Sequence, residues 1–359
     1  MSLFSAFDEL GLKNRCVMAP MTRCACDEDG LPTPNLADYY VRRAKNDVAL
    51  IIIESAAINN THAMGYKNGL QFYTKEHMEA WKPIVRDIQS HGAKVWLQIF
   101  HAGRLTVPEI TGGKSLSSSA IAPLGSESFW RPKKNDEIVH FQTETPFLVP
   151  TEVDSNQIKS LIYEFTQSCL LAQKAGFDGV ELHGAHGYLL HQFSHLHCNQ
   201  RLDEFGAQNF EFARQCVLQC REAVGPEFTL SYRLSVHMVD NSFVRHDPNE
   251  LDFSELVKVL EGAGIDVFHA SELSSRHPVF GGDLTLHEII RASSSKPIIV
   301  CGRVSDLDTA NQLIVSGEAD LVAFGRLFIS NPNLMELLRT EKEYELRKFN
   351  YTSDMDEVF

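Results

Sequence analysis

The sequence predicts a closed (β/α)8 barrel, on two observations. Short runs of apolar and β-branched residues recur along the whole chain, and each is followed by a segment whose apolar residues have helical spacing. Eight such pairs fit into 359 residues. Strands that are apolar on both faces and alternate with helices form parallel sheets covered by helices. Eight repeats over this length favour closure into a barrel.

Each predicted strand is followed by an interval long enough for one helix. The strand candidates are residues 15–20, 49–55, 94–101, 178–184, 229–235, 267–272, 298–302 and 321–326. The helix candidates are residues 35–45, 76–90, 156–175, 210–223, 253–264, 284–292, 306–316 and 331–338. Three of these helices end at Gly92, Gly176 and Gly264, where we expect a left-handed C-cap.

An open doubly wound sheet is the alternative architecture for this pattern. That fold normally has a glycine-rich phosphate loop after its first strand. Here the position reads Pro20-Met21-Thr22-Arg23, and the chain contains no GxGxxG. Gly113-Lys114-Ser115 does not complete a P-loop, because Pro108 occupies the position of its first glycine.

One segment interrupts the repeat. Residues 105–154, after the third strand, are rich in Ser, Pro, Gly and charged residues and are too long for an ordinary βα loop. We expect them to form a capping subdomain over the barrel mouth. It would be inserted in a single barrel domain of residues 1–340, with residues 341–359 as a polar C-terminal tail.

Composition narrows the choice of partners and compartment. The chain has 33 Lys and Arg against 47 Asp and Glu, a net charge of −14, which disfavours nucleic acid and anionic membranes as partners. Its longest apolar run, from Val48 to Ile53, is far below the roughly 20 residues of a membrane-spanning helix. We therefore expect a cytoplasmic protein, monomeric or homo-oligomeric, whose eight cysteines are reduced.

Polar residues close most of the predicted strands, at the end where barrel enzymes place their chemistry. They are Thr22, Ser55, Gln98, His101, His183, Arg233, Gly302 with Arg303, and Gly325 with Arg326. The two Gly-Arg pairs follow strands seven and eight, the usual phosphate site of this fold. Glycine lets backbone amides approach a phosphate and arginine binds two of its oxygens, so we predict a phosphate-bearing cofactor there. Coincidental surface arginines are the alternative.

Arg233 lies inside a predicted strand and needs a partner. A buried, unpaired guanidinium group is strongly destabilising. The partner is either the carboxylate of Glu181 on the neighbouring strand or a ring that becomes anionic during turnover. The residues alone leave both open.

Two imidazoles and a phenol follow strand four, at His183, His186 and Tyr188. Zinc binding is one interpretation, because the chain continues with His191, His195, His197 and Cys198. The tract has no obvious carboxylate ligand, and we predict no metal site. Two imidazole N–H groups aimed at one point can instead polarise a carbonyl or phenolate oxygen. A tyrosine with an ordinary pKa of about 10 can donate a proton at neutral pH.

Motifs along essentially the whole chain share the pattern of one family. They are Leu12-Lys13-Asn14-Arg15, Ala19-Pro20-Met21-Thr22-Arg23, Gln98, His183-Gly184-Ala185-His186-Gly187-Tyr188-Leu189, Asn199-x-Arg201-x-Asp203-x-Phe205-Gly206, Arg233, and Phe324-Gly325-Arg326 followed by Asn331-Pro332. With these residues the chain resembles the Old Yellow Enzyme family, FMN-dependent (β/α)8 ene-reductases that use NAD(P)H.

The resemblance implies FMN as cofactor and NAD(P)H as hydride donor. It implies that the flavin ring contacts Ala19, Pro20, Met21, Thr22, Ser55, Gln98 and Arg233, and that the phosphate contacts Gly302, Arg303, Gly325 and Arg326. Thr22 would lie near flavin O4 and N5, Gln98 at the pyrimidine edge, and Arg233 at N1 and O2. His183 and His186 would bind the substrate oxygen.

The reaction implied by the resemblance is ping-pong. NAD(P)H reduces the flavin and leaves, and a small α,β-unsaturated carbonyl or nitro compound takes its place. Hydride then goes to the β-carbon while Tyr188 protonates the α-carbon. Thr22 stands where one branch of the family has Cys, and His186 where another has Asn, so the branch stays open.

Two other functions remain possible from the residues. A barrel enzyme of different chemistry would use its Gly-Arg pairs to hold a phosphorylated substrate. A zinc-binding or redox-sensing protein would use Cys24, Cys26 and the tract of residues 191–198.

Overall fold

The computed structural model describes residues 1–359 apart from 124–127, 133–137, 143–146, 240–249, 351–353 and 355–359. Eight strands form a closed barrel in the order β1-β12-β11-β10-β9-β8-β3-β2, and each neighbouring pair is parallel. They are β1 (Cys16–Met18), β2 (Leu50–Ala57), β3 (Lys94–Phe100), β8 (Gly179–His186), β9 (Thr229–Met238), β10 (Val267–Ser271), β11 (Ile298–Cys301) and β12 (Leu321–Phe324). The predicted fold class and its eight strands are confirmed.

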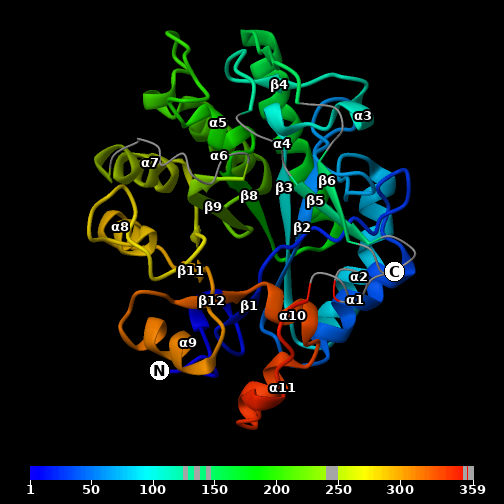
Figure 1. Cartoon of the computed structure of the whole chain (residues 1–359), viewed down its shortest axis with the longest axis vertical. Coiled ribbons are helices and arrows are strands. Elements are labelled where there is room, and N and C mark those ends of the chain that lie inside the picture. Colours follow the sequence, from blue (N-terminus) through cyan, green and yellow to red (C-terminus); the bar gives the residue numbers. More distant parts are fainter. Residues whose placement is uncertain (124–127, 133–137, 143–146, 240–249, 351–353, 355–359) are drawn as a thin grey trace.

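Helices surround the barrel (Figure 1). Those between strands are α1 (Pro34–Ala44), α2 (Lys75–Ser90), α4 (Ser155–Ala175), α6 (Glu211–Val224), α7 (Glu250–Ala263), α8 (Leu286–Ser293) and α9 (Leu307–Val315), with the shorter α5 (Leu189–Phe193) directly after β8. After β12 come α10 (Arg326–Ser330) and α11 (Leu334–Arg339). Single 3-10 turns cover Asp8–Leu10, Gly103–Leu105, Ala207–Asn209 and Glu343–Glu345. No helix in the described part of the chain combines the length and apolar character that crossing a bilayer requires.

Local signals in the sequence set the helix ends. The Asp154 side chain accepts hydrogen bonds from the backbone N–H groups of Asn156 and Gln157, and the Gln157 side chain accepts one from the Asp154 N–H. This capping box satisfies N–H groups that have no partner within the helix. At the other end of α4, Gly176 takes the left-handed conformation with φ 94°, as predicted.

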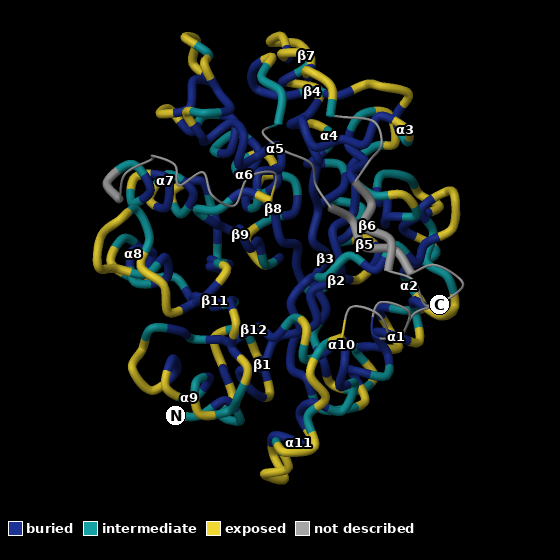
Figure 2. The backbone as a smooth tube through the Cα atoms, in the orientation of Figure 1, coloured by how far each residue is buried: buried dark blue, intermediate teal, exposed yellow. Residues whose placement is uncertain are grey.

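Two apolar layers hold the barrel together. The larger cluster packs the helices against the outside of the strands. The smaller one contains strand residues from the interior, such as Trp96 and Ile299, and is closed by Phe7 and Leu12 of the N-terminal hairpin. Figure 2 shows the strands buried along their length. In β3 the apolar Trp96 precedes the polar Gln98, which lies nearer the carboxyl end of the strand.

The segment after β3 has secondary structure of its own. It contains α3 (Pro108–Thr111), the parallel pair β4 (Leu116–Ser117) and β7 (Thr151–Glu152), and the antiparallel pair β5 (Ser128–Pro132) and β6 (Ile138–Gln142). The role expected for residues 105–154, a cap over the barrel mouth, stays a prediction.

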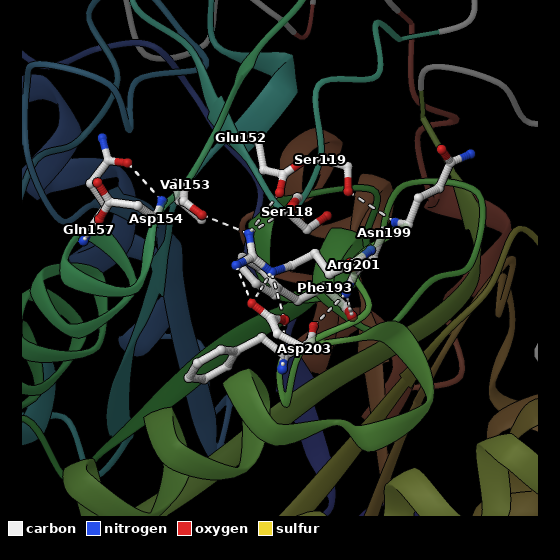
Figure 3. A network of polar contacts seen from close by, with 12 residues as sticks. Ser118, Ser119, Glu152, Val153, Asp154, Gln157, Phe193, Asn199, Arg201 and Asp203 are labelled. Carbon is white, nitrogen blue, oxygen red and sulfur yellow. Dashed lines mark hydrogen bonds and ion pairs between the residues drawn. The ribbon is translucent and has the colours of Figure 1, made fainter.

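Arg201 ties this segment to the loop after α5 (Figure 3). Its guanidinium group donates hydrogen bonds to the carbonyl oxygens of Val153 at 2.6 Å and Ser118 at 3.3 Å, and forms an ion pair with Asp203. Asn199 donates to the carbonyl oxygen of Phe193 at 2.7 Å. The Asn-Arg-Asp run of the sequence therefore has a structural role, because it fastens the inserted segment to the loop that follows β8.

A buried carboxyl group holds the loop after β1. Glu54 in β2 accepts hydrogen bonds from the Arg23 backbone N–H at 2.8 Å and from the Tyr40 hydroxyl at 3.2 Å. Burial raises the pKa of Glu54 to about 7, although its contacts with Arg23 oppose the shift. The folded protein therefore holds a proton on Glu54 at pH values where the unfolded chain has lost it.

The raised pKa of Glu54 predicts a specific pH dependence of stability. Its contribution is fully present below about pH 4.5 and is lost as pH rises towards 7. Between pH 4 and 8 the wild-type free energy of unfolding should fall by about 3 kcal/mol more than that of Glu54→Gln, which cannot titrate. Urea unfolding of both proteins across this range measures the difference. Parallel curves would contradict the shift.

Removing the Arg201 guanidinium should destabilise the fold. Arg201→Met leaves two buried carbonyl groups without their donor, and we expect a loss of about 2 kcal/mol in the free energy of unfolding. Arg214→Met is the matched control, because it removes a partly exposed ion pair with Glu211 on one helix, worth less than about 1 kcal/mol. Chemical unfolding followed by circular dichroism compares the two. Equal losses would refute the structural role of Arg201.

Candidate active site

Parallel pairing brings the polar strand ends to one rim of the barrel. In the register, Gln98 of β3 lies opposite Glu181 of β8, and His183 of β8 lies opposite Arg233 of β9. Arg233 in turn lies opposite His269 of β10. Residues that are far apart in the sequence therefore lie side by side in adjacent strands, as the barrel prediction requires.

Gln98 is fully buried, and both ends of its amide group are engaged. Its Oε1 accepts a hydrogen bond from the Ser55 hydroxyl at 2.6 Å, and its Nε2 donates to Glu181 Oε1 at 2.7 Å. Two of the predicted flavin-contacting residues, Ser55 and Gln98, are thus brought into direct contact.

Arg233 keeps one buried donor without a protein partner. Its Nη2 donates to the Ser271 hydroxyl at 2.9 Å, whereas its Nε has no hydrogen-bond partner. Glu181 is not its ion-pair partner, because that carboxylate instead contacts His269 Nδ1 at 2.8 Å. Glu181 is therefore not in direct contact with the guanidinium, although the two charges still interact. An unpaired buried N–H suits an external acceptor such as the edge of an anionic ring.

His183, His186 and Tyr188 form one cluster at the end of β8. The His183 ring centroid lies 5.3 Å from that of His186 and 4.8 Å from that of Tyr188. His186 has a positive φ of 61°, and its Nε2 lies 3.1 Å from the Ser271 hydroxyl. Ser271 thus connects the guanidinium of Arg233 to an imidazole of the cluster.

Both imidazoles are neutral at physiological pH. Burial is the main cause that lowers the pKa of His183 and His186 well below its usual range, and the positive charge of Arg233 lowers it further. His237 packs against His186 with ring centroids 4.9 Å apart and adds to the effect there. A neutral imidazole carries one N–H donor and one acceptor nitrogen. The pair can therefore donate to an oxygen without protonating it.

Gly302 and Gly325 follow the neighbouring strands β11 and β12. Gly302 has φ 145°, and a Cβ there would lie 2.6 Å from the Glu272 carbonyl oxygen, so only glycine fits. Arg303 and Arg326 are exposed, and neither guanidinium makes a hydrogen bond or ion pair among the described residues. The close backbone approach at Gly302 and two uncommitted cations suit a phosphate group.

The flavin-contacting residues predicted after β1 adjoin one of these glycines. The Ala19 N–H donates to the Phe324 carbonyl oxygen at 3.0 Å, and a Cβ on Gly325 would lie 3.3 Å from the Met21 sulfur. Pro20 is buried, and Met21 and Thr22 are half-buried. The residues from 19 to 22 thus run along the rim from β1 towards the second Gly-Arg pair.

Sequence reasoning missed two neighbours of the cluster. The Tyr66 hydroxyl forms a short hydrogen bond with the Tyr188 hydroxyl, and it comes from the loop between β2 and α2. No spacing in the sequence points to Tyr66. Ser271 closes the predicted strand 267–272, so the rule that selected the other strand ends could have found it.

The zinc and thiol alternatives gain no support. Among the described residues, no group of three His, Cys, Asp or Glu side chains is placed to hold a metal ion. Burial raises the pKa of the Cys26 thiol, with Glu54 adding to the shift. A reactive, redox-sensing cysteine has a lowered pKa instead.

Comparison with known proteins identifies the family. Residues 3–345 match the family model described as NADH:flavin oxidoreductase / NADH oxidase family. The 12-oxophytodienoate reductase 1 of Oryza sativa subsp. japonica is 32% identical over 357 residues, which cover 96% of this chain and 88% of that protein. The NADH oxidase of Thermoanaerobacter brockii is 30% identical over 354 residues, or 94% of this chain, but the chain spans only 50% of that longer protein.

Solved structures agree with the sequence relatives. Morphinone reductase in complex with tetrahydroNAD has a TM-score of 0.84 and 27% identity, covering 99% of this chain and 94% of that one. The Old Yellow Enzyme homologue from Zymomonas mobilis has a TM-score of 0.82 and 28% identity, covering 97% and 94%. The chain belongs to the NADH:flavin oxidoreductase / NADH oxidase family and is an FMN-dependent NAD(P)H oxidoreductase of the Old Yellow Enzyme type.

Proposed function

We propose that the protein is an ene-reductase that uses NAD(P)H to reduce the C=C bond of small α,β-unsaturated carbonyl or nitro compounds by a ping-pong mechanism. The observation that carries the proposal is the cluster of two neutral imidazoles and one phenol, His183, His186 and Tyr188, at the barrel rim beside Arg233. Such a cluster combines oxygen binding with proton donation.

The residues present fit FMN. The unpartnered Nε of Arg233 offers a donor to the ring, and the tight backbone at Gly302 with two uncommitted arginines suits the phosphate. We propose that the flavin ring contacts Ala19, Pro20, Met21, Thr22, Ser55, Gln98 and Arg233. The phosphate of FMN would contact Gly302, Arg303, Gly325 and Arg326. When bound, FMN supplies hydride transfer from NAD(P)H to the substrate.

His183 and His186 bind the oxygen of the carbonyl or nitro group. Each neutral imidazole donates one hydrogen bond, which draws electron density from the conjugated C=C bond and makes the β-carbon electrophilic. Because the pKa of both groups lies well below its usual range, they polarise the oxygen without protonating it. Their contribution grows as negative charge develops on that oxygen in the transition state.

Tyr188 donates the proton to the α-carbon. Its hydroxyl lies in a short hydrogen bond with the Tyr66 hydroxyl. Once Tyr188 has given up its proton, Tyr66 can donate a hydrogen bond to the resulting phenolate oxygen and stabilise it. Tyr66 therefore assists the donor, and solvent replaces the proton between turnovers.

The relatives support a reductase of carbonyl-bearing organic compounds. They include proteins named 12-oxophytodienoate reductase, NADPH dehydrogenase and morphinone reductase. A barrel enzyme that holds a phosphorylated substrate at its Gly-Arg pairs would need those pairs to be free of cofactor. Stoichiometric FMN in the purified protein would exclude that alternative.

The proposal is tested by spectroscopy of the purified protein. We expect bound flavin absorbance that NADPH or NADH bleaches under anaerobic conditions, and that returns when 2-cyclohexenone or a nitroalkene is added. A flavin that is reduced by the nicotinamide but not reoxidised by any activated alkene would contradict the ene-reductase assignment.

Replacing the proton donor should affect one half-reaction only. Tyr188→Phe should slow reoxidation by an enone by about 100-fold or more, because general acid catalysis typically contributes at least this factor. Reduction by NADPH needs no proton from Tyr188 and should change by less than about twofold. Stopped-flow measurement of each half-reaction separates the two, with Tyr163→Phe on the exposed face of α4 as control. Equal losses in both half-reactions would refute the role.

A further inference from the structure

A chain of buried polar groups crosses the barrel interior from β2 to β10, and the proposed mechanism does not use its inner half. It runs from Ser55 through Gln98 and Glu181 to His269, with contacts of 2.6, 2.7 and 2.8 Å. Gln98, Glu181 and His269 have no exposed surface. Ser231 adds a fourth contact, donating to Glu181 Oε2 at 3.3 Å.

The Glu181 carboxylate fixes which way the Gln98 amide faces. An ionised carboxylate only accepts hydrogen bonds, so the group beside Glu181 Oε1 must be the NH2 of Gln98. The Gln98 oxygen is then left facing the Ser55 hydroxyl, which donates to it. With a neutral partner in place of Glu181, both amide orientations of Gln98 would be acceptable.

The Glu181–His269 contact, 2.8 Å long and fully buried, is an ion pair when His269 is protonated. Burial opposes both charges, yet His269 lowers the pKa of Glu181, and Glu181 raises the pKa of His269. The other ionisable groups acting on the pair are Arg233 and Cys301, from the strands on either side of β10. His269 in turn acts on His183. With His269 protonated, the charge of Glu181 is balanced and that of Arg233 remains available.

We propose that Glu181 and His269 are positioning residues for FMN: Glu181 holds Gln98 in one amide orientation, and His269 neutralises Glu181 so that the positive charge of Arg233 acts on the flavin. The inference rests on the proposed placement of Gln98 and Arg233 at the ring. Neither residue touches the cofactor or substrate in this account.

A contribution to stability does not explain why Glu181 and His269 are buried together. Removing two charges from water is costly, and apolar side chains of similar volume usually serve a core as well or better. The pair also lies in register with the residues assigned to FMN, since Glu181 is opposite Gln98 and His269 is opposite Arg233. A positioning role explains both the cost and the location.

Two substitutions separate the two roles. Glu181→Gln keeps the shape but removes the orienting charge, and we expect about tenfold weaker FMN binding from loss of one well-placed hydrogen bond. His269→Asn leaves the Glu181 charge unbalanced beside Arg233. It should weaken binding of reduced relative to oxidised FMN about tenfold, which lowers the two-electron midpoint potential by about 30 mV.

A partly buried His–Glu contact outside the residues assigned to FMN offers a control. His287 of α8 lies 3.1 Å from Glu318, and neither residue is assigned to the cofactor or substrate. Glu318→Gln removes the same chemical group, and we expect FMN affinity and potential within about twofold and a few millivolts of wild type. Affinity is measured by fluorescence titration of apoprotein with FMN, and potential by redox-dye equilibration.

The outcomes distinguish the inference from the function on which it rests. If the wild-type apoprotein binds no FMN, the proposed FMN site itself is contradicted. If wild type binds FMN but Glu181→Gln and His269→Asn match the Glu318→Gln control, only the positioning role is overturned. Should His269→Asn not fold, His269→Gln carries the same expectation. Loss of thermal stability without a change in FMN affinity or potential also overturns the role.

Discussion

Parallel closure of eight strands is the constraint on which the rest of the structure depends. Because every barrel strand runs in the same direction, all the carboxyl ends meet at one rim, and residues from Thr22 to Arg326 can act on one ligand. Apolar residues such as Trp96 and Ile299 form a separate buried cluster of strand residues. The polar strand-end residues therefore lie together at the carboxyl-end rim.

Charge is distributed unevenly within that rim. Arg233 is a cation beside the cluster, and its charge adds to the effect of burial, the main cause of the lowered pKa of His183 and His186. The Glu181–His269 pair lies one step further into the barrel and balances its own charge. The same guanidinium that suits an anionic ring therefore helps burial to keep the two imidazoles neutral. One buried cation thus serves both halves of the proposed reaction.

The sequence predicted the fold better than the contacts within the site. All eight strands were found, because apolar runs bounded by helical spacing are a local signal, but α10 was not expected, since its five residues directly follow Gly325. The sequence does not show which side chain contacts Glu181 of β8. In the structure it is His269 of β10, which lies on the other side of β9. Tyr66 reaches Tyr188 from a loop whose path no periodicity describes.

A crystal structure of the FMN-loaded protein tests the central claim most directly. We predict the isoalloxazine ring at the rim, with its N1 and O2 edge within hydrogen-bond distance of Arg233, its pyrimidine edge at Gln98, and its open face towards His183 and His186. The phosphate would lie between the two Gly-Arg pairs. A flavin bound elsewhere on the barrel, or a ring whose face is covered by side chains other than this cluster, would contradict the account.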